Sequence, residues 1–540
     1  MRRRVLYTGT GVLLLIAAAA VSSLQIIEFL RTPPSDPIFL RQLLLGATLF
    51  RIAIAVLGLI IILLGWSTRK VETGETYQTP KLGWMWLLLL VALALRLYML
   101  GAGLWHDEIL TSVKYVHVPA GETVTTFEDQ NQHFLYTLLA QESIRLLGDN
   151  NWALRLPAVL FGVGSILALY LFGCLVSNRR EAFLSSALLT FSYHHIWFSQ
   201  NARGYTGLLF WTLLTSWLFL RAVRESRPRL WQFYAAAMAL AMYTNMTILF
   251  VAACHFLLFV MSDTKQKWSS FLSGFCLAAL LTLLLYSLVL PQLLGRGVGE
   301  VSTVPAWKSP FWTLLEFIGA LRTGFAGIIT VGIALAIFAA GLLSYVRTNR
   351  SVVMLFAVPL FLCFAVVAGM GHHIWPRFFF FAFGFAALIA VRGTMILGGM
   401  VSKLFQRSNP EKIGIILCTG MIFVSAVSIP QVYAAKQGFE EALRFVESHK
   451  QQSDAIVTVG LATITYRQYY KRDWPEVKTV EDLNSIRNRA RRTWIVFTFL
   501  PEVQSVYPDV MAVIRKDFRV EKEFHGTVGS GTIYVCRSLK

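Results

Sequence analysis

Long apolar runs separated by short polar turns occupy the first 430 positions of the chain. As helices, most of these runs are long enough to cross roughly 30 Å of hydrocarbon. The pattern therefore predicts an all-α polytopic membrane protein with about 13 transmembrane helices. The candidate spans are residues 5–27, 43–65, 82–100, 154–176, 182–198, 205–222, 231–244, 246–261, 269–290, 323–345, 352–370, 378–398 and 411–430.

The stretch 231–261 fits either one tilted span or two short helices. Basic clusters on both of its flanks favour the same side of the membrane, which two helices with a turn near Thr244-Asn245 would allow. We expect such a hairpin to stop short of the far surface and to form the floor of a cavity there. Irregular backbone at membrane depth needs protein or a water-filled cavity around it.

The pattern changes after about residue 431. A helix is predicted at 438–450, and strand-like runs follow at Ala455–Val459, Trp494–Phe499 and Thr532–Cys536. We therefore expect a small α/β domain at the C-terminus. The predicted organisation is two extra N-terminal helices in 1–80, a transmembrane module in 81–430 and a soluble domain in 431–540.

Composition agrees with this architecture. Hydrophobic residues make up 56% of the chain and charged residues only 15%, whereas about a quarter of a soluble protein is charged. A large soluble core is therefore excluded as the main architecture. The net charge of +19 is not a nucleic-acid footprint, because the Lys and Arg residues lie largely in the short turns between apolar runs.

The basic turns also predict an orientation. Seven of them fall on one side of the membrane if the N-terminus is cytoplasmic. They are Arg2–Arg4, Arg69-Lys70, Arg179-Arg180, Arg221–Arg229, Lys265–Lys267, Arg347–Arg350 and Lys403–Arg407. This parity predicts a multi-pass protein of the cytoplasmic (inner) membrane, with loops 101–153 and 291–322 and the C-terminal domain outside.

The first outer loop is acidic and contains His106-Asp107-Glu108. Neighbouring carboxylates diverge by about 100° on a helix and about 180° on a strand, so at most one of the two is expected to face a reacting group. The other would hold the loop or a neighbouring helix. A solvated acidic loop beside the interfacial Trp105 is the alternative interpretation.

Later in the same loop, Leu135, Leu138, Leu139 and Leu146 form one helical stripe, which is typical of a helix lying in the membrane interface. Asn131 suits its N-cap, and the free N–H groups there could bind an anion such as phosphate. His133 at that end would be either a substrate contact or a helix-surface residue.

Two arginines depart from the positive-inside pattern. Arg203 lies in the outer turn Ser199-Gln200-Asn201-Ala202-Arg203-Gly204-Tyr205, and Arg377 follows Pro376 at the outer mouth of a later span. A guanidinium fork suits two phosphate oxygens, although snorkelling to lipid head groups is an alternative. Together with the acidic loop, they suggest a carboxylate that works beside a phosphate.

Four segments resemble the GT-C membrane glycosyltransferases, in particular the protein-mannosyltransferase and aminoarabinose-transferase-like group of glycosyltransferase family 39. They occur in the family's order and on the expected side of the membrane. A looser fifth match is Pro376-Arg377-Phe378, and the resemblance covers roughly 82–400. The four segments are Trp105–Glu108, Asp129–Leu139, Trp152–Gly162 and Ser199–Tyr205.

The resemblance implies transfer of a sugar from a polyprenyl-phosphate donor to an acceptor hydroxyl, by inverting displacement at the outer membrane face. Asp107 would be the general base, supported by Glu108, Asp129 and His133. Arg203, Arg377 and Tyr205 would bind the donor phosphate, and His106, Asn131 and Gln200 would line the acceptor side or the pocket.

The resemblance names no required cofactor and no metal ligand, but leaves room for a divalent cation in the acidic loop. The expected partners are the lipid-linked donor, membrane lipid and a glycan, lipid or protein acceptor, without nucleic acid. Many relatives carry Pro-Pro where this chain has His133-Phe134, so the donor pocket should differ in shape. Competing interpretations are a flippase of a lipid-linked saccharide and a non-catalytic envelope assembly factor.

Overall fold

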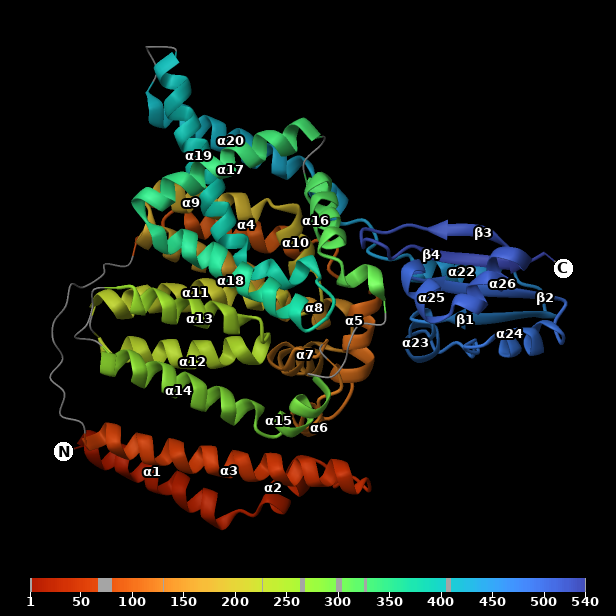
Figure 1. Cartoon of the computed structure of the whole chain (residues 1–540), viewed down its shortest axis with the longest axis horizontal. Coiled ribbons are helices and arrows are strands. Elements are labelled where there is room, and N and C mark those ends of the chain that lie inside the picture. The colour runs from red at the N-terminus through yellow and green to blue at the C-terminus, as the bar shows by residue number, and fades with distance from the viewer. Residues whose placement is uncertain are drawn as a thin grey trace.

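A helical body carries a small α/β domain at one end of the molecule (Figure 1). The computed structural model describes residues 2–66, 80–129, 131–225, 227–262, 268–297, 304–324, 328–404 and 409–539. The predicted basic turns Arg69-Lys70 and Lys265–Lys267 lie outside these residues, as do parts of Lys403–Arg407 and of loop 291–322. The general fold class expected from the sequence, a helical body with a small sheet-containing domain, is confirmed.

The longer helices of the body follow the apolar runs of the sequence, because a helix satisfies its backbone hydrogen bonds internally. Short helices mark the loops between them. The main helices are α1 (Arg2–Ala20), α2 (Ser23–Leu30), α3 (Pro37–Trp66), α4 (Met85–Leu97), α7 (Phe134–Leu147), α8 (Asn151–Val176), α9 (Arg179–Thr190), α10 (Tyr193–Ser199), α11 (Tyr205–Glu225), α12 (Pro228–Thr244), α13 (Ile248–Val260), α14 (Trp268–Tyr286), α16 (Pro310–Gly324), α17 (Ile328–Thr348), α18 (Arg350–Gly369), α19 (Phe383–Leu404) and α20 (Pro410–Val427). The short ones are α5 (His106–Leu110), α6 (Ala120–Thr125), α15 (Leu290–Gln292) and α21 (Ile429–Val432).

Seven stretches of helix among the described residues are long and apolar enough to cross a membrane, and an eighth is added if the bent pair α1–α2 is one span. The predicted span 5–27 is interrupted in the structure, since the chain bends by 91° between α1 and α2. The cause is local: Ser22 caps α2 by accepting a hydrogen bond from the Gln25 N–H. The thirteen-span count stays a prediction.

The predicted span 182–198 is also interrupted, as α9 ends at Thr190 and α10 begins at Tyr193. The fully buried Arg96 of α4 explains the break. Its guanidinium donates to the Leu189 and Thr190 carbonyls, each at 3.4 Å. Both carbonyls lie in the last turn of α9, where the regular helical hydrogen bonds end and a cation is favourable.

The predicted division of 231–261 into two helices, with a turn near Thr244-Asn245, is confirmed; the place of the turn below the membrane surface stays a prediction. Helices α12 and α13 are joined by a turn at residues 245–247, where the Asn245 side chain accepts from the Thr247 N–H at 3.0 Å. The last carbonyl of α12, at Thr244, lies 3.0 Å from Nδ1 of His133. The tip of the hairpin therefore contacts His133, one of the predicted site residues.

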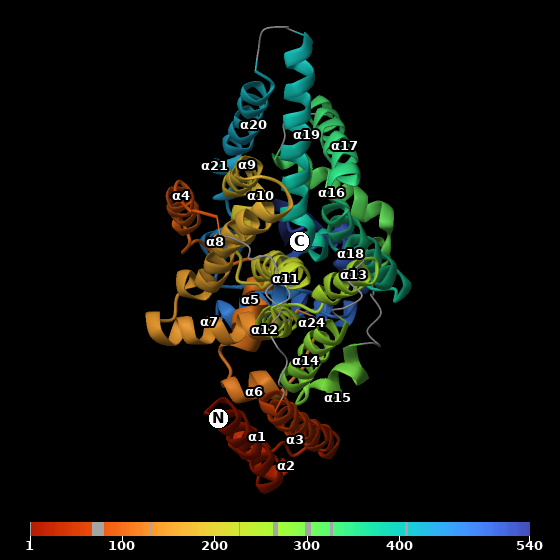
Figure 2. The ribbon, with the colours of Figure 1, turned by 90° about the vertical axis from the view of Figure 1, so that its left-hand side faces the viewer.

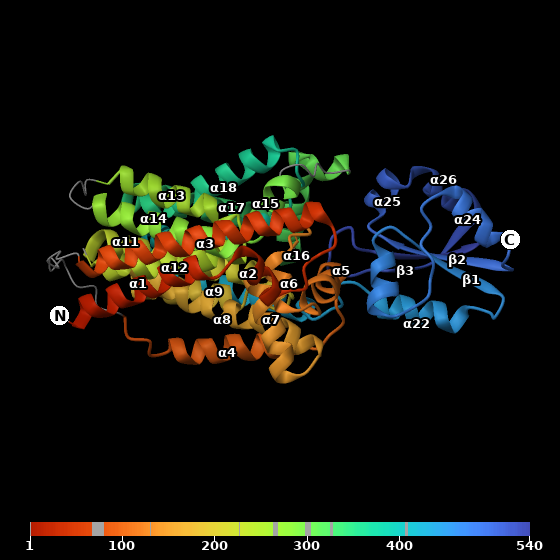
Figure 3. The same ribbon diagram turned by 90° about the horizontal axis from the view of Figure 1, so that it is seen from below.

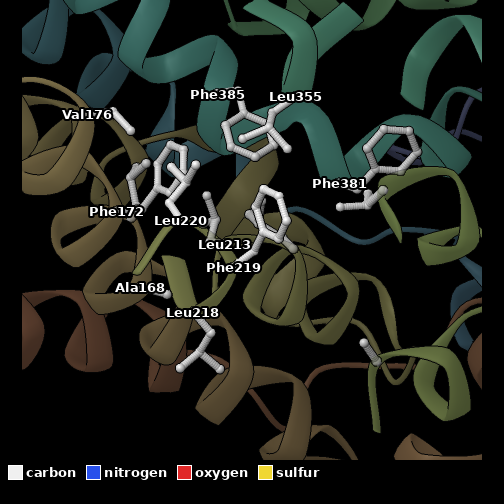
Figure 4. Packing of buried hydrophobic residues seen from close by; sticks show 14 of the residues in the cluster. Ala168, Phe172, Val176, Leu213, Leu218, Phe219, Leu220, Leu355, Phe381 and Phe385 are labelled. Carbon is white, nitrogen blue, oxygen red and sulfur yellow. The ribbon is translucent and has the colours of Figure 1, made fainter. Parts of the chain in front are cut away.

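The core of the body lies where α8, α11, α18 and α19 meet. Phe172, Leu213, Phe219, Leu355 and Phe385 are fully or almost fully buried there (Figure 4). Helices α17 and α19 cross so closely that a Cβ at Gly393 would lie 1.9 Å from the Ile337 carbonyl oxygen. Glycine at this crossing is therefore required by contact between the two backbones.

Three of the predicted basic turns gather at the end of the body far from the C-terminal domain (Figure 1). The Asn349 amide donates to the Val176 carbonyl at 3.0 Å and Arg224 to the Leu175 carbonyl at 3.1 Å. The α8–α9, α11–α12 and α17–α18 turns therefore share one surface. Helix α7 runs across the direction of α11 and α12 (Figures 1 and 2), as expected for a helix in the interface plane.

The C-terminal domain contains one sheet of four strands in the order β1-β2-β4-β3. Strands β1 and β2 are parallel and the other pairs antiparallel. Helix α22 (Phe439–His449) covers one face, and α24 (Val480–Arg487), α25 (Leu500–Val506) and α26 (Pro508–Asp517) cover the other (Figure 3). The strands are β1 (Asp454–Val459), β2 (Arg492–Thr498), β3 (Phe518–Phe524) and β4 (Ile533–Ser538).

The predicted helix and the three predicted strands of this domain are confirmed. Strand β3 is not predicted by the hydrophobic pattern, because its residues 519–523 include four charged side chains. Charged residues are common on an edge strand, because they discourage pairing with another chain. The apolar pattern that identified the inner strands is therefore absent from β3.

Candidate active site

The predicted site residues lie on elements at the end of the body that faces the C-terminal domain. Helix α5 follows directly on the loop after α4, and the turn between α10 and α11 packs beside it. The start of α7, the tip of the α12–α13 hairpin and the 3₁₀ helix η5 (Pro376–Ala382) complete the site. Segments from distant parts of the chain therefore meet at α5.

Asp107 is 7% exposed and pairs with Arg377, with 3.1 Å between Oδ2 and the guanidinium nitrogen. The Arg377 guanidinium also lies over the Trp375 ring, 4.7 Å from its centroid. Burial by itself would raise the pKa of Asp107, but the positive charges of Arg377 and Arg203 outweigh it and hold the pKa below its ordinary value. Asp107 is therefore an ionised carboxylate at neutral pH.

Glu108 points to other partners. Its carboxylate forms a bidentate pair with Arg155 of α8, both contacts being 2.7 Å, and accepts from the Ala202 N–H at 2.7 Å. Lys436 adds a contact at 3.6 Å. Burial alone would raise the pKa of Glu108, but Arg155, Lys436 and these hydrogen bonds lower it to about 2. The two neighbouring carboxylates diverge as the helical geometry predicts.

Arg203 lies 1% exposed in the turn before α11 and donates to the Asn131 side-chain oxygen at 3.0 Å. Its Nε and Nη1 are buried and have no hydrogen-bond partner among the described residues. The predicted N-cap role of Asn131 is wrong, because α7 begins only at Phe134. Asp129 instead accepts from the Asn131 N–H at 2.7 Å in a tight turn, and its carboxylate pairs with Lys114 at 3.5 Å.

His133 occupies the N-cap position of α7. Its Nδ1 faces the Thr244 carbonyl at 3.0 Å, so Nδ1 carries the proton and Nε2 is an acceptor in the neutral ring. Burial, and then the charge of Arg203, lower the pKa of His133 to about 3. Tyr205 packs edge-on against the ring, with centroids 5.3 Å apart. Nε2 is buried without a partner.

His106 and Gln200 lie at the margins of this group. The His106 ring packs against Phe499 of the C-terminal domain, with centroids 5.8 Å apart, and burial lowers its pKa to about 4. The Gln200 amide donates to the Arg96 and Tyr98 carbonyls at 3.0 and 2.6 Å. The structure thus brings Asp107, Arg377, Arg203, Asn131 and His133 together, whereas the Gln200 side chain joins α10 to the end of α4.

Within the part of the chain that the structure describes, several polar atoms around Asp107 are buried without a hydrogen-bond partner, although most buried polar groups in proteins have one. They belong to basic or imidazole side chains, and Asp107 is electrostatically coupled to all four of these residues. Buried donors and acceptors that lack a partner are suited to binding a polar, negatively charged ligand. They are His106 Nδ1, His133 Nε2, Arg203 Nε and Nη1, and Arg377 Nε.

Three residues support the site but were not among the predicted site residues, namely Arg155, Lys436 and Gln437. Arg155 had a detectable signal, because an arginine near the start of an apolar span requires a partner. Lys436 and Gln437 lie in the short connection between α21 and α22 and belong to no recognised motif. Their contacts depend on the docking of the C-terminal domain.

Comparison with known proteins places this arrangement in context. Residues 132–291 match the family described as dolichyl-phosphate-mannose-protein mannosyltransferase. ArnT from Cupriavidus metallidurans, in its apo state, is similar in structure with a TM-score of 0.50 and 12% identity, over 84% of this chain and 98% of that one. No curated protein matches in sequence.

Two further solved structures are similar. ArnT from the same organism bound to undecaprenyl phosphate has a TM-score of 0.49 and 13% identity, over 84% of this chain and 98% of that one. The Archaeoglobus fulgidus oligosaccharyltransferase with a tethered acceptor peptide has a TM-score of 0.49 and 11% identity, over 83% and 74%. The chain has the fold of the GT-C membrane glycosyltransferases, and the resemblance stated from the sequence is confirmed.

Proposed function

We propose that this protein transfers a glycosyl group from a polyprenyl-phosphate-linked donor to an acceptor hydroxyl at the outer face of the cytoplasmic membrane. One observation carries the proposal: the buried, ionised carboxylate of Asp107 lies 3.1 Å from the Arg377 guanidinium and is electrostatically coupled to Arg203, whose Nε and Nη1 have no hydrogen-bond partner in the described part of the chain. The matched family, whose name includes a dolichyl-phosphate-linked mannose donor, supports the donor class.

The chemistry needs no covalent intermediate. The acceptor oxygen attacks the anomeric carbon while the bond from that carbon to the phosphate oxygen breaks, which inverts the configuration. The hydroxyl proton passes to Asp107, and the electron pair of the broken bond leaves with the polyprenyl phosphate. General-base assistance of this kind is worth about 10²–10⁴-fold in rate.

Two arginines would stabilise the departing phosphate. Arg203 has two buried nitrogen atoms, Nε and Nη1, that have no acceptor among the described residues. Arg377 has one such atom, Nε, in addition to its contact with Asp107. Fixed charges at the point where negative charge develops lower the barrier without reorganisation. Because they supply positive charge at the leaving group, we expect the reaction to require no cofactor, and we propose no residue as a metal ligand.

Arg203→Ala should weaken donor binding by about 10- to 100-fold, as expected for loss of a charge-assisted bond of about 1.5–3 kcal/mol. The measurement is the affinity of the purified protein for undecaprenyl phosphate, used as a donor analogue. Arg145→Ala is a matched control, because Arg145 lies on the exposed part of α7 and pairs only with Glu142 among the described residues. If Arg203→Ala and Arg145→Ala bound undecaprenyl phosphate with equal affinity, the donor phosphate would not bind at Arg203.

The proposed orientation places the N-terminus in the cytoplasm, with thirteen spans and the C-terminal domain outside. Single cysteines at Glu128 and Gln451, both exposed, should react with an impermeant thiol reagent in intact cells, whereas one at Arg180 should be protected. The background should be Cys276→Ala, since Cys276 is the exposed native cysteine. If the cysteine at Arg180 reacted and those at Glu128 and Gln451 were protected, the protein would have the opposite orientation in the membrane.

A further inference from the structure

Two consecutive residues of the connection into the C-terminal domain are buried against α5. Lys436 and Gln437 are 7% and 5% exposed and precede α22 by one residue, Gly438. They lie between the helix that carries Asp107 and the sheet of the C-terminal domain. We call this pair the tail clamp.

Gln437 joins α5 to the sheet through both ends of its amide. Its oxygen accepts from the His106 N–H at 2.9 Å. Its nitrogen donates to the Gly531 carbonyl at 2.8 Å and to the Thr498 hydroxyl at 3.2 Å. Thr498 ends β2, so the amide connects the residue before Asp107 with the central part of the domain.

Lys436 holds the residue on the other side of Asp107. Its ammonium lies 3.6 Å from the Glu108 carboxylate and donates to the Gln200 carbonyl. It also lies over the Trp197 ring, 5.3 Å from the centroid. The tail clamp therefore contacts both neighbours of Asp107 but not, in any described interaction, Asp107 itself.

Helix α5 needs such support. It runs directly into the π-helical segment Thr111–Val116, and an isolated helical segment of this combined length is still only marginally stable in water. His106 is its first residue, so the His106 N–H has no acceptor within the helix. Gln437 supplies that acceptor from a segment 331 positions away in the chain.

Other contacts fix the C-terminal domain on the body. The Trp197 indole donates to the Thr527 hydroxyl at 2.9 Å, and Tyr469 donates to the Asn151 side chain at 3.3 Å. The Thr527 N–H also bonds the Ala435 carbonyl at 3.1 Å, directly before the tail clamp. The clamp is thus held from the side of the domain as well as from the side of α5.

We propose that the C-terminal domain positions the Asp107 carboxylate through the tail clamp, with Gln437 as the main positioning residue. The functional meaning of this role rests on the proposed function, in which Asp107 is the base. The domain is then a fixed part of the active site. Sugar transfer would require it even if it touches neither donor nor acceptor.

The proposal predicts a specific kinetic change. Gln437→Ala should lower kcat about tenfold and leave the KM for the lipid-linked donor nearly unchanged, because the base moves while the donor-binding arginines stay in place. Tyr469→Phe is the matched control, since it removes one hydrogen bond between the domain and Asn151 of α8 but keeps the Tyr469 ring and both residues of the tail clamp. It should leave both constants unchanged.

Hydrogen–deuterium exchange of the full-length protein tests positioning without any assay of sugar transfer. In Gln437→Ala, amides within 104–112 should exchange about tenfold faster than in the wild type, while β1 and β2 keep their protection. Tyr469→Phe should match the wild type. Lys436→Met provides a second variant if Gln437→Ala does not fold, with the same expectation.

Unchanged exchange over 104–112 in a folded tail-clamp variant would overturn the proposal. So would faster exchange over the whole C-terminal domain, because that result would mean general loosening. If α5 loosens but Asp107→Asn retains full transfer activity, the positioning role stands and the proposed function fails. The two inferences are therefore tested separately.

Discussion

Replacing Glu108 by glutamine should destabilise the protein by about 3–5 kcal/mol, the usual cost of removing one partner of a buried ion pair. Glutamine keeps the shape of the side chain but leaves the charges of Arg155 and Lys436 uncompensated. All three side chains are buried, since Arg155 is 2%, Lys436 7% and Glu108 0% exposed. The effect should appear as a marked fall in the midpoint of thermal unfolding in detergent.

Glu128→Gln is the control for this prediction. Glu128 lies in the same loop, but it is exposed and contacts Lys114 at 3.6 Å. An exposed pair of this kind is worth about 0–1 kcal/mol, so the midpoint should hardly move. If Glu108→Gln unfolded at the same temperature as Glu128→Gln, the structural role of Glu108 would be wrong.

The dependence of stability on acidic pH should reveal the same Glu108–Arg155 ion pair. The pKa of Glu108 falls from its ordinary 4.5 to about 2 in the folded protein. A carboxylate with a lowered pKa stabilises the fold fully above its unfolded value and loses that contribution as the pH falls toward the folded value. The contribution of Glu108 should therefore disappear between about pH 4.5 and 2, and the Glu108→Gln variant should lack this step.

Asp107→Asn should reduce sugar transfer about 10²–10⁴-fold, since it removes the proton acceptor and keeps the volume of the side chain. Expression and donor binding should change little, because Glu108 anchors α5 independently. The measurement is the recovery of envelope glycans, by mass spectrometry, in a deletion strain that carries the variant. Recovery to the wild-type level would remove Asp107 from the catalytic role.

The dependence of kcat on pH is an independent test of the ionisation of Asp107. Its pKa lies below the ordinary value because Arg377 and Arg203 outweigh the effect of burial. Transfer by the wild type should therefore persist down to pH values below the ordinary range of Asp. Arg377→Gln removes the largest cause of the lowering, so the acid limb of kcat should move to higher pH in that variant.

Local patterns were enough to predict much of the fold. The hairpin at 231–261 followed from its length and from the basic clusters on both flanks, and the inner strands of the C-terminal domain followed from their apolar runs. The break within 182–198 could not be predicted in this way. It depends on Arg96, whose guanidinium reaches the end of α9 from another helix.

The site was predictable to a similar extent. Two arginines that depart from the pattern of the basic turns indicated where positive charge would meet the acidic loop, and the structure pairs Arg377 with Asp107. The helical geometry predicted that only one of the two adjacent carboxylates could face that charge. It could not show that Lys436 and Gln437 complete the support, because no local pattern links residues more than 300 positions apart.

The proposed role of Asp107 is that of the base in cleavage of a lipid-linked sugar donor. The most direct measurement is the release of free polyprenyl phosphate from lipid-linked sugars extracted from native membranes, by purified protein in the presence of a membrane acceptor extract. The wild type should release it, whereas Asp107→Asn should bind the extract but release little. Release by Asp107→Asn at the wild-type rate would contradict this role, as would movement of the intact donor across vesicles by the wild type without any release.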